Sequence, residues 1–220
     1  IIVAVSVAVI TIELFRSAVP FANALRDSSF QVASIITTTG FSTADFNLWS
    51  GTSRTILVML MFVGACAGST GGGMKVSRFV ILFKTVFKEL DSYIHPKRIQ
   101  KLSLDGKPIE HDVVRSINVY FITFTVIFAA SLLLVSLEGK DLVTNFTAVA
   151  ATINNIGPGL ELAGPTQNFV HFSILTKYVL MFDMLAGRLE LFPLLILFHP
   201  AVWRDIHTTH RRWKIKRMEE

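Results

Sequence analysis

The sequence has little cysteine and little charge. Cys66 is the single cysteine among 220 residues, and one thiol can form neither an internal disulfide nor a metal site of several cysteines. Charged residues make up only 17% of the chain and hydrophobic residues 51%. Uncharged stretches such as 117–137 reach the roughly 20 residues that a membrane-spanning helix requires. The composition therefore predicts an integral membrane protein.

The start of the chain also lacks the basic segment of a signal peptide. Residues 1–12 are apolar from the first residue onward. We expect them to form the end of a membrane-spanning helix that has lost its beginning.

Basic residues are scarce in the apolar blocks and gather in two segments. Of the 21 lysines and arginines, 15 lie within 75–115 or 204–217. The positive-inside rule assigns both segments to the cytoplasm, which puts the segments around residues 40 and 157 outside. A solvated loop that sets the topology explains these charges better than contact with nucleic acid.

A short apolar run that ends in hydroxyl side chains and glycine follows Asp27. Asp27 is a good N-cap, and a helix over 27–37 would measure roughly 15 Å, half of the ~30 Å hydrocarbon core. An interfacial amphipathic helix is the alternative, but no lysine or arginine lies between Asp27 and Asp45 to line its polar face. We therefore predict a pore helix at 27–37 and a filter at 38–42, whose backbone carbonyls can replace the water shell of a cation.

The same pattern returns 117 positions later. Aligning Gly40 with Gly157 without gaps also superimposes three apolar pairs, Val32 with Val149, Ala33 with Ala150 and Ile36 with Ile153. This predicts a second pore helix at 142–153 and a second filter at 155–159, with Phe41 and Pro158 bracing the outer rim. The carbonyls expected to face the ion belong to Thr38, Thr39, Gly40, Asn155, Ile156 and Gly157.

A glycine-rich stretch interrupts the apolar segment 53–93. As one helix this segment would span about 60 Å, twice the hydrocarbon thickness. Consecutive glycines destabilise a helix interior by about 1 kcal/mol each. A phosphate-binding loop is disfavoured because Met74 separates Gly73 from Lys75. A packing kink stays open, but we favour an intramembrane gate within 64–74, made by Gly68, Ser69, Thr70, Gly71, Gly72, Gly73 and Lys75.

Arg188 lies in a second long apolar segment, 169–203. An arginine at membrane depth costs a few kcal/mol on insertion scales, so it needs a partner or a wet cavity. One interpretation is an ion pair with one of three carboxylates, those of Glu190, Asp183 and Glu13.

Four motifs together resemble the Trk/Ktr/HKT superfamily of potassium transporters, and within it the bacterial TrkH type. They follow the order of the family and span nearly the whole chain: Thr37–Phe41, Gly64–Lys75, Asn154–Gly159 and Gly187–Glu190. The resemblance implies an all-α integral membrane fold with two outer helix–pore loop–inner helix repeats of a fourfold pseudo-symmetric, potassium-channel-like pore. The third repeat would be 1–93, a cytoplasmic linker 94–111, the fourth repeat 112–203 and a basic cytoplasmic tail 204–220.

The resemblance also implies a function and its setting. A multi-pass protein of the bacterial inner membrane would take up potassium, alone or as a symporter with another ion. The glycine-rich loop would lie under the filter, and Arg188 would line the pore and oppose cation passage. The implied partners are lipid, a second copy in a homodimer and a cytosolic nucleotide-binding subunit of the TrkA type. We expect no nucleic-acid partner, no organic cofactor and no enzymatic activity.

Two alternatives stay open. A membrane-embedded enzyme or nucleotide-driven pump would need an acidic phosphorylation site or a Walker motif, and the sequence has no credible one. A non-transporting subunit of a membrane complex is harder to exclude, because two repeats supply only half of a fourfold ring. Either the chain is part of a longer protein or copies of it associate.

Overall fold

The chain folds into helices arranged as two similar units. The computed structural model describes residues 1–64, 72–95, 102–104 and 106–188. Within these residues lie seven α-helices: α1 (Ile2–Arg16), α2 (Phe21–Ile36), α3 (Gly51–Phe62), α4 (Val76–Ile94), α5 (His111–Ser136), α6 (Leu142–Ile153) and α7 (Ile174–Arg188). The predicted helical fold is confirmed.

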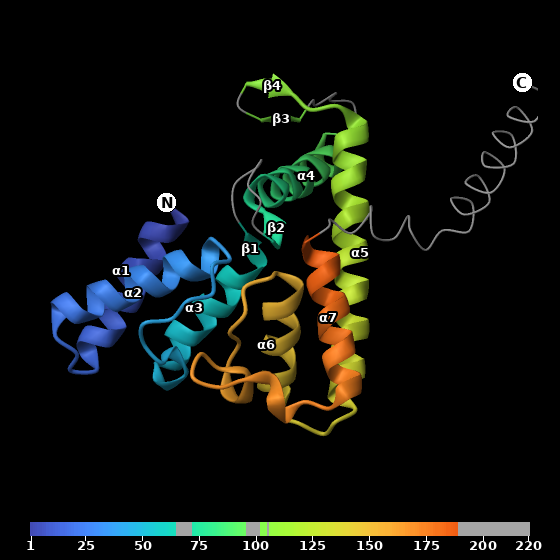
Figure 1. The fold of residues 1–220 in the computed structure, drawn as a ribbon. Helices are drawn as coiled ribbons and strands as arrows, with labels where there is room; N and C mark the ends of the chain where they lie inside the picture. The colour runs from blue at the N-terminus through green and yellow to red at the C-terminus, as the bar shows by residue number, and fades with distance from the viewer. Residues whose placement is uncertain (65–71, 96–101, 105, 189–220) are drawn as a thin grey trace, which may run out of the picture.

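Each unit has a helix that ends in an irregular turn, packed between two others. In the first unit α1 and α3 contact α2, and in the second unit α5 and α7 contact α6. Figure 1 shows the units side by side, with α3 and α6 in contact where they meet. The figure also shows α4 lying across the N-terminal end of α5, while the loop between α5 and α6 lies at the opposite end.

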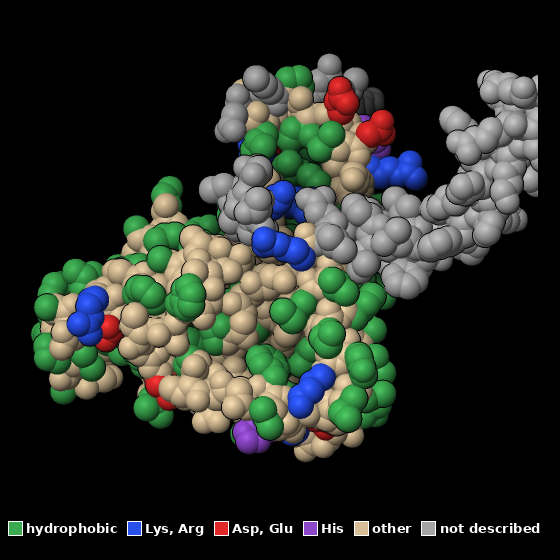
Figure 2. Space-filling model, viewed as in Figure 1, with side chains coloured by type: hydrophobic (Ala, Val, Ile, Leu, Met, Phe, Trp, Pro, Cys, Tyr) green, Lys and Arg blue, Asp and Glu red, His purple; other side chains and the backbone are tan. Residues whose placement is uncertain are grey.

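One described helix, α5, is both long enough and apolar enough to cross a membrane. Its 26 residues extend about 39 Å at ~1.5 Å per residue. Large apolar side chains on α5 are exposed, among them Val126 at 61% and Leu133 at 71%. Figure 2 shows further hydrophobic side chains at the surface of both units and over α4. Such a surface is favourable where lipid covers it.

The short helix α6 lies at the centre of the second unit. Nine of its twelve residues are buried. It begins where the Asp141 carboxylate accepts a hydrogen bond from the backbone N–H of Thr144, at 3.0 Å. Its bounds are those predicted for the second pore helix, because an N-cap directly precedes an uncharged run of twelve residues.

The first short helix, α2, starts earlier than predicted. It begins at Phe21, directly after Pro20, and Asp27 lies inside it, paired with the neighbouring Arg26. Pro20, whose φ is fixed, is the N-cap residue, so Asp27 does not cap this helix. The helix has 16 residues, so it measures about 24 Å, still short of the ~30 Å needed to cross the hydrocarbon core.

The predicted break in the first long segment is present. The helix α3 ends at Phe62 and α4 begins at Val76. Between them β1 (Val63–Gly64) and β2 (Met74–Lys75) form a two-residue parallel pair. A second pair, antiparallel, joins β3 (Ser103–Leu104) to β4 (Lys107–Pro108) within the predicted linker. Each pair is only two residues long, so the fold remains helical.

The last described helix, α7, begins at Ile174 rather than at 169. Residues Phe169–His171 form a 3-10 turn, η3, and Ser173 Oγ then accepts a hydrogen bond from the N–H of Thr176. Two more 3-10 turns are η1 (Phe46–Leu48) and η2 (Glu161–Ala163). The rest of the apolar segment 169–203, from 189 onward, and the predicted basic tail 204–220 lie outside the described residues.

Candidate functional site

The helices α2 and α6 end in the same hydrogen-bonded turn. In the first copy, Thr38 N–H donates to Ile35 O and Thr39 N–H donates to Ser34 O. In the second copy, the N–H groups of Asn155 and Ile156 donate to the carbonyls of Thr152 and Ala151. Each donor and each acceptor of the second copy lies 117 positions after its counterpart. The repeat seen in the sequence is therefore a repeat of backbone structure.

The backbone angles of the two segments also agree. Thr38 and Asn155 both have φ 55°, while Gly40 has φ 79° and Gly157 has φ 113°. Positive φ is uncommon for residues other than glycine, and for a β-branched threonine it is an outlier. Positive φ thus occurs at the first and third positions of each predicted filter. The backbone there is not helical, so each helix ends before the predicted filter.

The two segments touch each other. A Cβ built on Gly40 would overlap the carbonyl oxygen of Ile156, and it would lie 3.4 Å from Cδ of Pro158. Only glycine leaves room for this approach. At Gly157, in contrast, a Cβ would meet nothing within 4 Å. The segments lie side by side at Gly40 and are open at Gly157.

The glycine-rich break lies against the C-terminal ends of both short helices. Gly72 N–H donates to Thr38 Oγ1 at 3.3 Å. A Cβ on Gly72 would lie 2.5 Å from the carbonyl oxygen of Asn154, and one on Gly73 would lie 2.9 Å from Asn154 Oδ1. The predicted gate residues Gly72 and Gly73 are thus next to both filters. The other glycine-loop residues of the predicted gate, Gly68 to Gly71, are outside the described residues.

The helix α7 contacts the second filter through Gly187. A Cβ on Gly187 would overlap the carbonyl oxygen of Ile153. Asn155 Nδ2 donates to the Met184 carbonyl at 3.0 Å. Gly187 is followed by Arg188, the last described residue of α7, whose side chain is exposed.

Two of the three carboxylates considered for Arg188 are bonded to other groups. Asp183 accepts a hydrogen bond from Ser131 Oγ at 2.6 Å, and Glu13 lies 3.9 Å from Arg16. These contacts occupy one oxygen of each carboxylate, Asp183 Oδ1 and Glu13 Oε1. Glu190 is outside the described residues.

Polar side chains within the two short helices, which the sequence motifs do not single out, contact the predicted filters and the residues that follow them. Ser34 Oγ donates to the Phe41 carbonyl, and Thr147 Oγ1 accepts from Leu160 N–H at 2.9 Å. Gln31 is fully buried and faces the backbone of Thr43 and Ala44. Polar residues at buried positions of short apolar helices are the signal that could have identified them.

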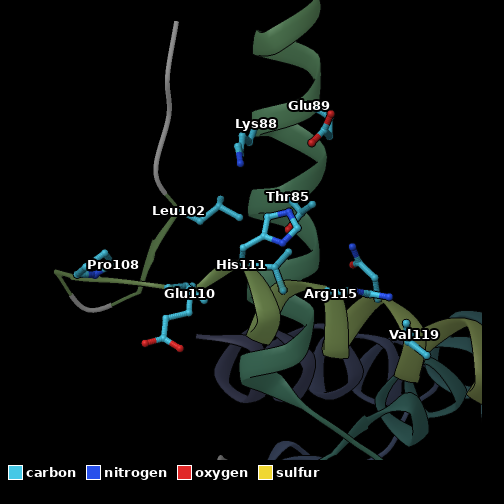
Figure 3. Close-up of a pocket in the computed structure, with 12 residues that line it drawn as sticks. Thr85, Lys88, Glu89, Leu102, Pro108, Glu110, His111, Arg115 and Val119 are labelled. Carbon is cyan, nitrogen blue, oxygen red and sulfur yellow. The ribbon is translucent and has the colours of Figure 1, made fainter.

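A cavity of about 640 Å³ lies away from the filters, between α4, α5 and the β3–β4 pair. Figure 3 shows His111, at the start of α5, directed toward Thr85 of α4. The lining of the cavity includes the side chains of Lys88, Glu89, Glu110, His111 and Arg115. The cavity lies on the face where the sequence places the cytoplasmic basic segment.

Comparison with known proteins gives one consistent result. A profile for TrkH, described as cation transport protein, matches residues 4–204. The Trk system potassium uptake protein TrkH of Salmonella typhimurium is 37% identical over 181 residues, which are 82% of this chain and 37% of that protein. TrkG of Escherichia coli is 34% identical over 178 residues, 81% of this chain and 36% of that protein.

A solved structure agrees with these relatives. The crystal structure of the potassium transporter TrkH from Vibrio parahaemolyticus has a TM-score of 0.83 and 36% sequence identity. The match covers 92% of this chain and 43% of that chain. The chain thus spans well under half the length of the relatives it matches. These proteins are transporters and not enzymes, and this chain belongs to the TrkH family of cation transport proteins.

Proposed function

We propose that the chain supplies two pore repeats of a potassium uptake transporter, and that the ion passes beside the two filter segments. The observation that supports this most is the pair of equivalent turns after α2 and α6, which contact each other at Gly40 and Ile156. The relatives are named as potassium uptake proteins. Residues 1–93 and 112–203 would then be the third and fourth repeats.

Backbone carbonyls would be the ion ligands. The six carbonyls are those of Thr38, Thr39, Gly40, Asn155, Ile156 and Gly157. The C-terminal ends of α2 and α6 point into these segments, and the negative end of a helix dipole favours a cation there. Each filter has one glycine at its third position, so few carbonyl rings would be organised. We therefore expect weaker discrimination against sodium and rubidium than in a full channel filter.

The glycine-rich break would close the inner side of the filter. Gly72 and Gly73 contact Thr38 and Asn154, so an ion leaving the filters inward would meet this segment first. Glycines can change backbone conformation at low steric cost, which suits a segment that opens. Arg188 follows Gly187, which packs on the end of α6, and its positive charge would oppose cations on the same side.

The complete transporter needs more than this chain. Two repeats cannot close a fourfold ring, so we propose that they assemble with the remaining repeats as a multi-pass protein of the bacterial inner membrane. A homodimer and a TrkA-type nucleotide-binding subunit on the basic inner face complete the proposed assembly. The cavity lined by Lys88, His111 and Arg115 lies on that face. Coupling to a second ion, as in a symporter, also belongs to this proposal.

Uptake by the full-length gene product tests the proposal. In bacterial cells without other potassium uptake systems, it should restore growth at low potassium and take up rubidium. Potassium should compete with rubidium more strongly than sodium does. Rubidium uptake no greater than in vector controls, with the protein present in the membrane, would refute transport and favour a non-transporting subunit.

A further inference from the structure

A group of polar contacts joins the two repeats on the side away from the glycine-rich break. Asn47 Oδ1 accepts a hydrogen bond from Glu161 N–H at 2.9 Å, and the Arg54 guanidinium pairs with the Glu161 carboxylate. Thr166 Oγ1 donates to Asp45 Oδ2 at 3.2 Å. We call Asp45, Asn47, Arg54, Glu161 and Thr166 the outer bridge. Its partners are 107 to 121 residues apart in the sequence, so it links the first copy to the second.

On the second copy, the outer bridge is next to the filter. Glu161 lies two residues after Gly159, the last residue of the predicted filter. It has φ 52°, a left-handed conformation that a glutamate rarely adopts without support. Gly159 N–H donates to Ala163 O at 2.6 Å, and a Cβ on Gly159 would crowd Thr147 Oγ1 at 2.9 Å. A shift at Glu161 would therefore move the filter rather than be absorbed by a loose loop.

On the first copy, the residues of the outer bridge lie at η1 or in α3, which are held by buried side chains. Asp45 Oδ1 accepts from the N–H of Asn47 and so caps η1, whose Phe46 is fully buried. Arg54 lies in the first turns of α3, and Leu57 of the same helix is fully buried. The groups that hold Glu161 thus have fixed positions.

We infer that the outer bridge sets the spacing of the two filter segments, and that Arg54 and Glu161 are positioning residues for cation selectivity. This inference rests on the proposed function. Selection by carbonyl oxygens depends on where the oxygens stand, and a functional site tolerates displacements of only about 0.5 Å. A bridge two residues from one predicted filter can hold its carbonyls within that tolerance, and none of its three charged groups needs to touch the ion.

The test compares single and double variants in the full-length transporter. Arg54→Gln and Glu161→Gln should each lower the preference for rubidium over sodium by about threefold, equivalent to roughly 0.7 kcal/mol. The double variant Arg54→Gln with Glu161→Gln should lose no more than either single variant, because both remove the same pair. The measurement is inhibition of rubidium uptake by sodium, normalised to the amount of protein in the membrane.

The two single variants also distinguish positioning from a direct effect of charge at the pore mouth. Arg54→Gln and Glu161→Gln change the local charge in opposite directions, so a charge effect would shift the apparent KM for rubidium in opposite directions. Positioning shifts selectivity in the same direction for both. Arg26→Gln is the matched control, since it removes an exposed ion pair with Asp27 that lies within one copy. It should retain the selectivity of the unmodified protein.

Three outcomes would overturn the inference: unchanged selectivity in both single variants, additive losses in the double variant, or an equal loss in Arg26→Gln. A protein without rubidium uptake before any substitution would instead overturn the proposed function, and with it this inference. Glu161→Asp, which keeps the charge and the backbone contact, should regain part of the selectivity lost in Glu161→Gln.

Discussion

Replacing Gly40 by alanine tests the contact between the two filter segments. The substitution adds a single methyl group, and that group would overlap the carbonyl oxygen of Ile156. The same substitution at Gly139 is a close control. Gly139 also has positive φ, 69° against 79° at Gly40, but a Cβ there would meet nothing within 4 Å.

The expected magnitude follows from two terms. A left-handed conformation costs alanine about 1–2 kcal/mol, and this term applies to both variants. Forcing extra atoms into a packed contact adds about 1–3 kcal/mol, and this term applies to Gly40→Ala alone. If the filter relieves the overlap by moving, a penalty of about 2 kcal/mol leaves the original geometry in roughly one molecule in thirty. Rubidium uptake per molecule should then fall at least about tenfold.

The assay is the initial rate of rubidium uptake by the full-length protein, divided by its amount in the membrane. Gly139→Ala should transport within about twofold of the unmodified protein, since only its backbone strain applies. Equal uptake per molecule in Gly40→Ala and Gly139→Ala would refute the reasoning, because it would mean that Gly40 does not meet the second filter in the working transporter.

Three further predictions concern stability, measured as thermal unfolding of the purified full-length protein. Thr147→Val removes the acceptor of the buried Leu160 N–H and should destabilise by about 1–3 kcal/mol, whereas Thr125→Val, at an exposed position of α5, should have little effect. Asp183→Asn keeps the acceptor for Ser131 and removes a buried carboxylate whose Oδ2 has no hydrogen-bond partner among the described groups, so unfolding should occur at an equal or higher temperature. A decrease in unfolding temperature as large as that in Ser131→Ala would contradict the expectation that the Asp183 charge does not stabilise the fold. For Glu138, burial raises the pKa, but hydrogen bonds from Ser173 and Thr176 and the charge of Lys140 outweigh it, and the net pKa is lowered from 4.5. Its stabilisation should be present above pH 4.5 and lost as the pH falls through the lowered pKa, so Glu138→Gln should lose less stability on acidification than the unmodified protein; parallel curves would contradict this.

The repeat and its second helix could be predicted because their signals are local. Gly40 and Gly157 align over a run of apolar residues, and Asp141 directly precedes α6. The start of α2 could not be predicted by the same rule. Two start signals, Pro20 and Asp27, lie seven residues apart, and sequence alone does not rank them. Packing decides, because the residues between them include Ala24, which is fully buried against α1.

The start of α7 shows the same competition. The apolar segment 169–203 is long enough for one continuous helix. In the structure, however, Asn168 caps the short turn η3 and Ser173 caps α7. Two caps five residues apart divide a run that hydrophobicity alone treats as one. For Arg188 the sequence offered several carboxylates, and two of them, Asp183 and Glu13, also contact Ser131 and Arg16.

The contacts between repeats are of another kind, since no local pattern contains them. Asn47 and Glu161 are separated by 114 residues, and each has a local interpretation of its own, as a loop amide and as a surface carboxylate. Only the placement of α3 beside α6 brings them together. The ion ligands could be proposed from sequence because backbone carbonyls follow from the glycine pattern. The groups that we infer to fix the spacing of those carbonyls are side chains from both copies, so their contacts depend on the tertiary fold. If selectivity depends on that spacing, as we propose, it is encoded by contacts between the two copies and not within either predicted filter.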